Sequence, residues 1–350
     1  MPDRITVGLI TNPEGAHLSD YLAALAASDE VEAVALADHT GQIEAAARKA
    51  LGEKLHGIYR DPATMLRETK PALALVTLEA ALAPPAIDAA LEFGCHVLTE
   101  KPACLRAEDF AALVEKAEKK HLEIMLALAN RLHAPVQEAK RLVAAGMLGK
   151  VYGAELHIIA DQTRLRSAAY HRQWYAQKRR AGGGHLIWLG IHWLDLALYI
   201  SGLTVRDVAG FIALVGGQPI DVEDSAAVVL RFDNGSLGTL TSGYYLDRGY
   251  HSHVQLWGEH GWLRLASFEE QPLEWYSTAA GQPATIQRFA YPQGGRSYTP
   301  FVRACARFAA GLAPAPITSR ECLHVLQTIF ACYRAAESGQ SQRLSSNPAD

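Results

Sequence analysis

The sequence lacks the features that mark several classes of protein. Its five cysteines are odd in number and include no CxxC pair, which indicates buried thiols and neither a disulfide framework nor a thiolate zinc site. No stretch approaches roughly 18 uninterrupted apolar residues, the length of a membrane-spanning helix. The N-terminus lacks the apolar core and cleavage site of a signal peptide. These absences predict a soluble protein located in the cytoplasm.

An excess of positive charge is also missing. The chain has 33 lysines and arginines against 37 aspartates and glutamates, a net charge of −4, so it has no field that would hold nucleic acid. Hydrophobic residues make up 49% of the sequence, enough for sizeable cores. Because 350 residues exceed what one core usually organises, two domains are expected.

The first third of the chain alternates short apolar strands with helical stretches. Strands are expected at 5–10, 31–37, 72–77, 96–98 and 123–128, and helices ending near 27 and spanning 43–51, 84–93 and 107–119. Alternating β and α units specify a parallel sheet with helices on both faces. The sequence therefore predicts an α/β fold that begins with a doubly wound, Rossmann-type domain over residues 1–127.

The pattern then changes to long strands joined by turns. After a helix at about 136–145, strands are expected at 151–159, 205–215, 225–232, 237–244, 254–257 and 262–265. A long helix is expected at 184–201, and further helices at 298–312 and 319–337. This predicts an α+β domain on a large antiparallel sheet over 128–338, followed by a polar, frayed tail at 339–350.

The helix expected at 184–201 carries one polar stripe. At about 100° per residue, the side chains of His185, Trp188, His192, Asp195 and Tyr199 fall within an arc of roughly 80°. The rest of the helix is apolar, so the stripe is typical of the wall of a polar cleft, although His192 and Asp195 also fit a satisfied internal pair. No metal site is predicted, because His185 and His192 lie about 10.5 Å apart along the axis and no HExxH pattern is present.

Several motifs resemble one family. The glycines at 182–184 with Gly190, His192 and Asp195 are similar to the GGG…G.H..D segment of the Gfo/Idh/MocA oxidoreductases. The run HVLTEKP at 96–102 resembles the EKP signature of that family, and Asn130 with Arg131 resembles its entry to the second domain. Glu223 with Asp224 and the residues 232–235 resemble its ED…RF.NG strand pair, so the resemblance runs from about residue 5 to 335.

The resemblance implies chemistry for particular residues. It implies that Lys101 stabilises a developing alkoxide and that His192 acts as general acid and base, both facing one cleft between the domains. It implies a carbohydrate-like small-molecule substrate and a homo-oligomer, a dimer or tetramer, formed through the large sheet. The residues expected to contact that substrate are Trp188, Asp195, His185, Trp174 and Arg131.

NAD is the expected cofactor, with NADP less favoured. Asp38 ends the second strand, where an acid would bind the ribose hydroxyls, although aspartate is also a common helix cap. Thr77 resembles the threonine of the TP.H loop of the family. The residues expected at the cofactor are Thr11, Asn12, Gly15, Asp38, Thr77, Glu100 and Lys101.

The chain departs from the family at two places. Trp188 stands where the family usually has a catalytic aspartate, and His185 one turn earlier is a candidate replacement or a structural cap. The loop after the first strand is about two residues shorter than G.GG.G and keeps Gly15. Asn12 and Pro13 predict a helix that starts at Pro13, with Glu14 either as a helix-start residue or as an occupant of a former phosphate site.

Three functions remain open from the sequence. The leading one is an NAD-dependent oxidoreductase acting on a hydroxyl of a sugar, polyol or related derivative. The second is a sugar lyase, hydratase or glycosidase in which NAD is recycled or absent, and the third is a silent sugar-binding homologue. Trp174 and the basic run Lys178, Arg179 and Arg180 would contact an acidic sugar or, as charge runs in loops usually are, would be solvated.

Overall fold

A computed structural model describes residues 4–266, 269–291 and 297–344. The chain folds as two compact units. The first contains the residues up to Ala129, the short segment Arg179–Gly182 and a later segment that ends at Leu323. The second contains Asn130–Lys178, the long segment from Gly183 onward and the chain from His324. The first unit thus takes in two segments that lie beyond the boundary expected near residue 127.

The first unit is built on a six-stranded parallel sheet, as the sequence predicted. Its strands run in the order β3-β2-β1-β4-β5-β6, the order of a dinucleotide-binding fold. They are β1 (Ile5–Thr11), β2 (Val31–Ala37), β3 (Leu55–Tyr59), β4 (Leu73–Thr77), β5 (His96–Thr99) and β6 (Ile124–Leu126). The order reverses between β1 and β4, where Thr11 pairs with Thr77. We call the carboxyl ends of these two strands, with the loops that follow them, the switch point.

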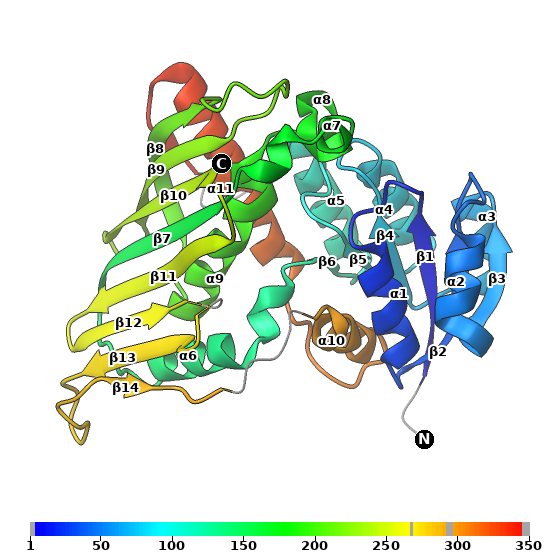
Figure 1. The fold of residues 1–350 in the computed structure, drawn as a ribbon. Coiled ribbons are helices and arrows are strands. Elements are labelled where there is room, and N and C mark those ends of the chain that lie inside the picture. Colours follow the sequence, from blue (N-terminus) through cyan, green and yellow to red (C-terminus); the bar gives the residue numbers. More distant parts are fainter. Residues whose placement is uncertain (1–3, 267–268, 292–296, 345–350) are drawn as a thin grey trace. The chain divides into compact units, whose positions relative to one another are not determined.

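Helices cover both faces of this sheet, so β1, β4 and β5 are almost wholly buried. The helices are α1 (Leu18–Ala27), α2 (Glu44–Leu51), α3 (Pro62–Thr69), α4 (Ala83–Glu92), α5 (Ala107–Lys119) and α10 (Thr299–Ala309). Helix α10 packs on α1 (Figure 1), and Arg303 and Arg307 of α10 pair with the buried Glu30. This packing explains why a segment so late in the chain belongs to the first unit.

The second unit is built on a nine-stranded sheet in the order β14-β13-β12-β11-β7-β10-β9-β8-β15. The strands are β7 (Val151–Asp161), β8 (Val205–Ala213), β9 (Ser225–Phe232), β10 (Leu237–Leu246), β11 (Tyr250–Gly258), β12 (Gly261–Leu265), β13 (Leu273–Ser277), β14 (Gln287–Arg288) and β15 (Gln342–Arg343). The large antiparallel sheet expected from the sequence is confirmed, and β7 and β10 are the one pair of neighbours among the described strands that run in parallel. The other pairs are antiparallel, which is possible because hairpins connect most neighbours.

One face of this sheet packs against helices. Helix α6 (Ala134–Ala144) contacts α9 (Ile191–Ser201), and α9 contacts β7 and β11. Short helices lie at Thr163–Arg166, Ala168–His171, Trp174–Ala176 and Lys178–Ala181, and α11 spans Ser319–Ser338. The prediction of a frayed tail at 339–350 is wrong for its first part, because β15 pairs with β8 through backbone hydrogen bonds. Residues 345–350 lie outside the described residues.

All five cysteines are buried and unbridged, as predicted. Burial raises the pKa of the Cys95 and Cys332 thiols to about 12, so neither forms a reactive thiolate at neutral pH.

Candidate functional site

Two threonines and a glycine pack tightly at the switch point of the first unit. The Thr11 hydroxyl donates to the carbonyl of Thr77 at 3.2 Å, and the Thr77 hydroxyl donates to the carbonyl of Ala16 at 2.7 Å. A Cβ atom on Gly15 would lie 2.6 Å from the Thr77 carbonyl oxygen, so no larger residue fits there. Three of the residues expected at the cofactor are therefore gathered where open α/β sheets bind dinucleotides.

The loop after β1 differs from its prediction. Helix α1 starts at Leu18 and not at Pro13. The Asn12 side chain accepts a hydrogen bond from the Glu14 amide at 2.9 Å, and the Gly15 amide donates to the Asn12 carbonyl at 3.0 Å. Asn12 therefore closes a tight turn instead of capping a helix. Glu14 consequently lies in the loop and is not a helix-start residue.

Glu14 forms part of an ion-pair cluster at the same place. The Arg180 guanidinium contacts the carboxylates of both Glu14 and Glu79. Glu79 follows β4, so the two carboxylates come from the two loops of the switch point. Arg180 is 21% exposed, and the expectation that the basic run is solvated is therefore wrong for this residue. We call Arg180, Glu14 and Glu79 the Arg180 cluster.

Asp38 follows β2 and is buried. Its carboxylate accepts hydrogen bonds from the Thr40 amide at 3.0 Å, the Thr40 hydroxyl at 2.7 Å and the Ile43 amide at 2.9 Å. Burial works against ionisation, but these hydrogen bonds lower the pKa of Asp38. The carboxylate therefore holds the turn that leads into α2, while its place at the end of β2 also suits a ribose-binding acid.

Glu100 and Lys101 follow β5 and are both buried. The Glu100 carboxylate accepts from the Tyr21 hydroxyl at 2.5 Å and from the Lys101 amide at 3.2 Å. Burial, followed by the charge of Glu100, raises the pKa of Tyr21 well above its usual value, so its phenol stays protonated and donates. Tyr21, which the sequence pattern did not single out, thus fixes the carboxylate beside Lys101.

Close backbone packing in the second unit explains Gly184, the last glycine of the run at 182–184. Both the Gly184 amide, at 2.5 Å, and the Leu186 amide, at 2.9 Å, donate to the Glu223 carboxylate. A third bond comes from the Tyr333 hydroxyl at 2.8 Å. A Cβ atom on Gly184 would overlap the Glu223 backbone. Glu223 therefore holds the start of the helical segment that carries the candidate site residues.

That segment is not one regular α-helix. Residues Leu186–Gly190 form a π-helix, and α9 begins only at Ile191. A Cβ atom on Gly190 would lie 3.0 Å from the Ser242 hydroxyl, so Gly190 permits close approach to β10. A π turn contains more residues than an α turn, so the predicted 100° spacing does not hold across it. Around the helix axis, the side chains of His185 and Trp188 are therefore rotated relative to His192 by angles other than those of a regular α-helix.

His185 lies completely buried against β10. Its Nδ1 atom hydrogen-bonds the Ser242 hydroxyl at 2.6 Å, and its ring meets the Tyr244 ring edge-on at 4.3 Å. Burial and then the nearby charge of Arg164 lower the pKa of His185 to about 3. The imidazole is therefore neutral at physiological pH and does not supply the negative charge that an aspartate at position 188 would bring.

The low pKa of His185 makes stability depend on pH. Below pH 6.5, its usual pKa, His185 is protonated in the unfolded chain but stays neutral in the folded protein. The free energy of unfolding therefore falls as the pH falls. Between about pH 7.5 and about pH 5.5, His185 should remove about 1 kcal/mol from the free energy of unfolding. Denaturant titrations should show a smaller loss in His185→Gln, whereas His251→Gln, at an exposed position, should match the wild type. Equal losses in all three proteins would contradict this.

Aromatic rings surround Trp188. Its ring stacks on Tyr175 with centroids 4.9 Å apart, and it meets Trp174 edge-on at 5.4 Å. Trp174 is buried, whereas Trp188 and Tyr175 are partly exposed. The structure thus brings together two of the residues expected at the substrate, Trp174 and Trp188, and adds Tyr175, which the sequence pattern did not indicate.

The sequence pattern also did not indicate the polar residues that gather around Arg164. The Arg164 guanidinium donates to the Tyr250 hydroxyl at 3.0 Å and lies 5.5 Å from the ring of Tyr244. The hydroxyls of Tyr170 and Tyr244 are 3.3 Å apart. These residues come from three separate segments, and no motif in the sequence links them.

Arg131 and Asp195 form a buried ion pair within the second unit. Their side chains are 2% and 1% exposed, and the guanidinium approaches the carboxylate oxygens at 2.7–3.0 Å through two nitrogens. Both residues were expected to contact substrate, and the structure pairs them with each other. His192, 3% exposed, lies one residue after the start of α9.

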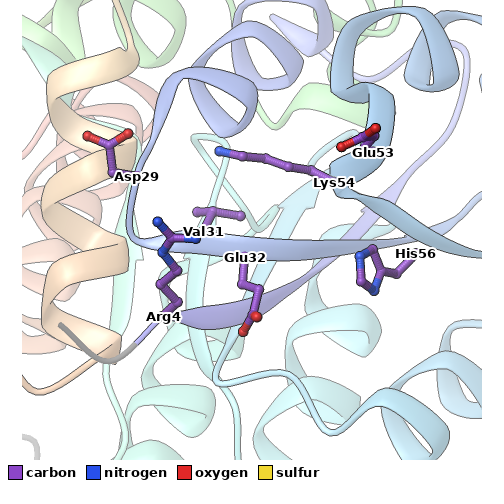
Figure 2. A pocket seen from close by; sticks show the side chains of 7 residues that line it. All are labelled: Arg4, Asp29, Val31, Glu32, Glu53, Lys54 and His56. Atoms are coloured by element: carbon purple, nitrogen blue, oxygen red, sulfur yellow. The ribbon is translucent and has the colours of Figure 1, made fainter. Parts of the chain in front are cut away.

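One pocket of about 340 Å³ lies at the opposite edge of the first sheet (Figure 2). It is lined by Arg4, Asp29, Val31, Glu32, Glu53, Lys54 and His56, at the amino ends of β1, β2 and β3. Lys54 donates to the carbonyls of Leu25, Ala26 and Ser28 and so caps the end of α1. The pocket is therefore separate from the switch point.

Metal-binding clusters and membrane-spanning helices are both absent from the part of the chain that the structure describes. There, no three histidine, cysteine, aspartate or glutamate side chains are grouped so as to hold a metal ion. In the same residues, no helix has the length and apolar character needed to cross a membrane.

The strand order and the packed switch point define a dinucleotide-binding fold, which is followed by a second unit built on a large sheet. Residues 14–128 match the family model described as "Oxidoreductase family, NAD-binding Rossmann fold", and residues 136–264 match the "GFO/IDH/MocA C-terminal domain". The chain belongs to the Gfo/Idh/MocA oxidoreductases.

Relatives in this family carry named activities. D-glucoside 3-dehydrogenase of Escherichia coli K12 is 26% identical over 85% of this chain and 86% of its own length. Myo-inositol 2-dehydrogenase of Thermotoga maritima is 28% identical over 58% of this chain and 59% of its own length.

Solved structures share the fold. Levoglucosan dehydrogenase in complex with NADH and L-sorbose superposes with a TM-score of 0.85 at 17% identity, over 99% of this chain and 100% of that one. The WlbA dehydrogenase of Bordetella pertussis, in complex with NADH and UDP-GlcNAcA, gives 0.83 at 20% identity over 99% of both chains.

Proposed function

We propose that the protein is an NAD-dependent oxidoreductase that oxidises a hydroxyl group of a sugar, polyol or related derivative. The observation that carries the proposal is the position of Lys101, a buried lysine two residues after the end of β5 at the carboxyl edge of the sheet. Open α/β sheets bind their ligands at this edge. The named dehydrogenases among the relatives support the same reaction class.

The reaction needs two groups from the protein. NAD, when bound, supplies the acceptor for the hydride that leaves the carbinol carbon. The Lys101 ammonium stabilises the negative charge that develops on the hydroxyl oxygen. The His192 imidazole takes the hydroxyl proton, and it returns a proton in the reverse direction. The hydrogen bond from Tyr21 keeps the Glu100 carboxylate on the Lys101 backbone amide and so holds the backbone that carries Lys101.

The residues at the switch point fit the cofactor. Gly15 lets the loop after β1 pack closely against the end of β4, at the place where a pyrophosphate would approach. We propose that Thr11, Asn12, Gly15, Thr77 and Glu100 hold NAD together with Asp38. A 2′-phosphate would be repelled by the Asp38 carboxylate, so NAD is favoured over NADP.

The second unit supplies the surface for the substrate in this proposal. Trp188 and Tyr175 form a partly exposed aromatic pair that suits the apolar face of a sugar ring. Trp174 packs edge-on against both rings and supports that surface, whereas Arg131 and Asp195 pair with each other and hold α9 in place. The non-redox and silent alternatives are not favoured, because the named relatives are dehydrogenases.

Nucleotide binding and turnover together test the proposed function. Mass analysis should find NAD or NADH released from the purified protein, or calorimetry should detect binding of added NAD. A panel of aldoses, glycosides, inositols and uronic acids, each mixed with protein and NAD, should give NADH with at least one member. Absence of both binding and NADH formation would overturn the proposal.

Trp188 should determine which sugar is preferred. Because an aspartate cannot stack on a sugar face, Trp188→Asp should change the ratio of kcat/KM values across the panel, and Trp188→Phe should largely preserve it. The change in preference should exceed the change in thermal stability. A large drop in melting temperature with an unchanged preference would mean that the indole only packs against Tyr175 and Trp174.

We also propose that the protein forms a homo-oligomer through the open face of its large sheet. Exposed apolar side chains come from five neighbouring strands there: Tyr152, Phe211, Val229, Leu237 and Trp257. Exposed apolar side chains on neighbouring strands of a sheet are typical of an interface between subunits.

A further inference from the structure

The Arg180 cluster joins the two loops of the switch point. Glu14 lies in the loop between β1 and α1, and Glu79 lies in the loop between β4 and α4. The backbone is fixed as well, because the Ala81 amide donates to the Arg180 carbonyl at 3.2 Å. Arg180 belongs to a four-residue segment that packs with the first unit although its neighbours in sequence belong to the second. This arrangement places a guanidinium beside the loop that follows β1.

The same loop offers few backbone donors. Dinucleotide sites usually bind the pyrophosphate with loop and helix amides at this position. Here Pro13 has no amide hydrogen, the Glu14 amide donates to the Asn12 side chain, and the Gly15 amide donates to the Asn12 carbonyl. These three positions therefore offer no amide to a pyrophosphate, and a side-chain donor at the same place would strengthen its binding.

A guanidinium is well suited to that task. It is planar, stays charged, and binds phosphate oxygens through two parallel hydrogen bonds. We propose that Arg180 binds the pyrophosphate of NAD and that Glu14 and Glu79 hold its guanidinium at the switch point before the cofactor arrives. This inference rests on the proposed function, because it assumes that NAD is the cofactor.

The carboxylates of Glu14 and Glu79 then have different roles. Glu79 is 8% exposed and remains the fixed partner of Arg180. Glu14 is 47% exposed, so it can turn to solvent and leave room for the pyrophosphate. Glu14 competes with the cofactor for Arg180, and Glu14→Gln should tighten NAD binding severalfold.

Calorimetry with NAD and with ADP-ribose tests the assignment. ADP-ribose keeps the pyrophosphate and lacks nicotinamide. Arg180→Gln should weaken binding of both ligands by at least about tenfold, by the same factor, because a charge-assisted contact is lost. The matched control is Arg179→Gln, which removes the same charge from the adjacent, exposed residue and should leave both affinities unchanged. Unchanged binding in Arg180→Gln, or weakening confined to NAD, would overturn the proposal.

A second pair of variants separates binding from charge neutralisation. Arg180→Gln alone also leaves two carboxylates unpaired, and their repulsion would weaken NAD binding by itself. In the Glu14→Gln/Glu79→Gln background that repulsion is absent, so adding Arg180→Gln should still weaken NAD binding about tenfold. Equal affinities of the double and triple variants would show that Arg180 only neutralises the carboxylates. Thermal unfolding of each variant checks that it is folded.

Binding of NAD and ADP-ribose by the wild-type protein distinguishes the role of Arg180 from the proposed function. If the wild-type protein binds neither NAD nor ADP-ribose, the proposed function and this inference are both wrong. If it binds them and the Arg180 variants bind equally well, the inference alone is wrong.

Discussion

Lys101→Met is expected to lower kcat/KM for the oxidised sugar by at least about 100-fold. Methionine has a similar length but carries no charge, so the developing alkoxide would lose its stabilising partner. NAD binding should change much less than turnover, because the ammonium acts on the substrate oxygen. Lys178→Met is the control, since Lys178 is exposed and pairs with Glu337 at 3.4 Å, and its kinetics should match the wild type.

The variant His192→Asn tests the removal of the proton from the substrate hydroxyl. His192→Asn should cost a comparable factor in kcat/KM, because asparagine cannot take up the hydroxyl proton. If both residues act in one step, the double variant should be little worse than either single variant. Full activity in Lys101→Met and in His192→Asn would rule out the assignment of both roles.

Asp195→Asn is expected to lower the free energy of unfolding of the second unit by about 3–5 kcal/mol. The substitution keeps the shape of the side chain but leaves the Arg131 guanidinium buried without its countercharge. Urea titration followed by tryptophan fluorescence measures the loss, since tryptophans of the second unit such as Trp193 report on it. If Asp195 only bound the substrate, Asp195→Asn would instead raise KM and leave the free energy of unfolding nearly unchanged.

The double variant Arg131→Met/Asp195→Leu provides the control for this buried pair. It removes both charges and keeps most of the volume, so it should recover much of the stability that Asp195→Asn loses. A stability loss below about 1 kcal/mol in Asp195→Asn would contradict a structural role for the ion pair.

Most of the first unit could be predicted because its strands are continuous apolar runs. The bounds of β2 and α5 match the expected ranges, and β1, β4 and β5 differ by one residue at an end. Strand β3 was missed because it lies at the edge of the sheet and is only partly buried. Helix α3 was missed although Asp61 caps it and Pro62 begins it, which is a recognisable start signal.

The loop after β1 shows why a local signal can mislead. Asn and Pro are good residues for the start of a helix, and they also suit a tight turn. The hydrogen bond from the Glu14 amide to Asn12 decides for the turn. The partner of Glu14, Arg180, lies 166 residues away in sequence, so no local pattern could reveal it.

The helix at His192 shows a similar limit. Its buried character was correctly expected from its apolar composition. The π-helix at Leu186–Gly190 ends where Gly190 approaches Ser242 of β10, and this contact joins segments that are distant in the sequence. The polar stripe drawn from a regular spacing was therefore correct only within α9, where His192, Asp195 and Tyr199 follow α-helical geometry.

Transfer of deuterium tests the central claim most directly. The sugar that the panel identifies would be supplied with deuterium on its ring carbons, together with NAD and the wild-type protein. Hydride transfer predicts that the nicotinamide of the product carries deuterium from the oxidised carbon, detected by mass spectrometry, and that Lys101→Met slows its appearance. A converted sugar with no deuterium on the nicotinamide would contradict the account, since the bond would then be broken without net redox chemistry.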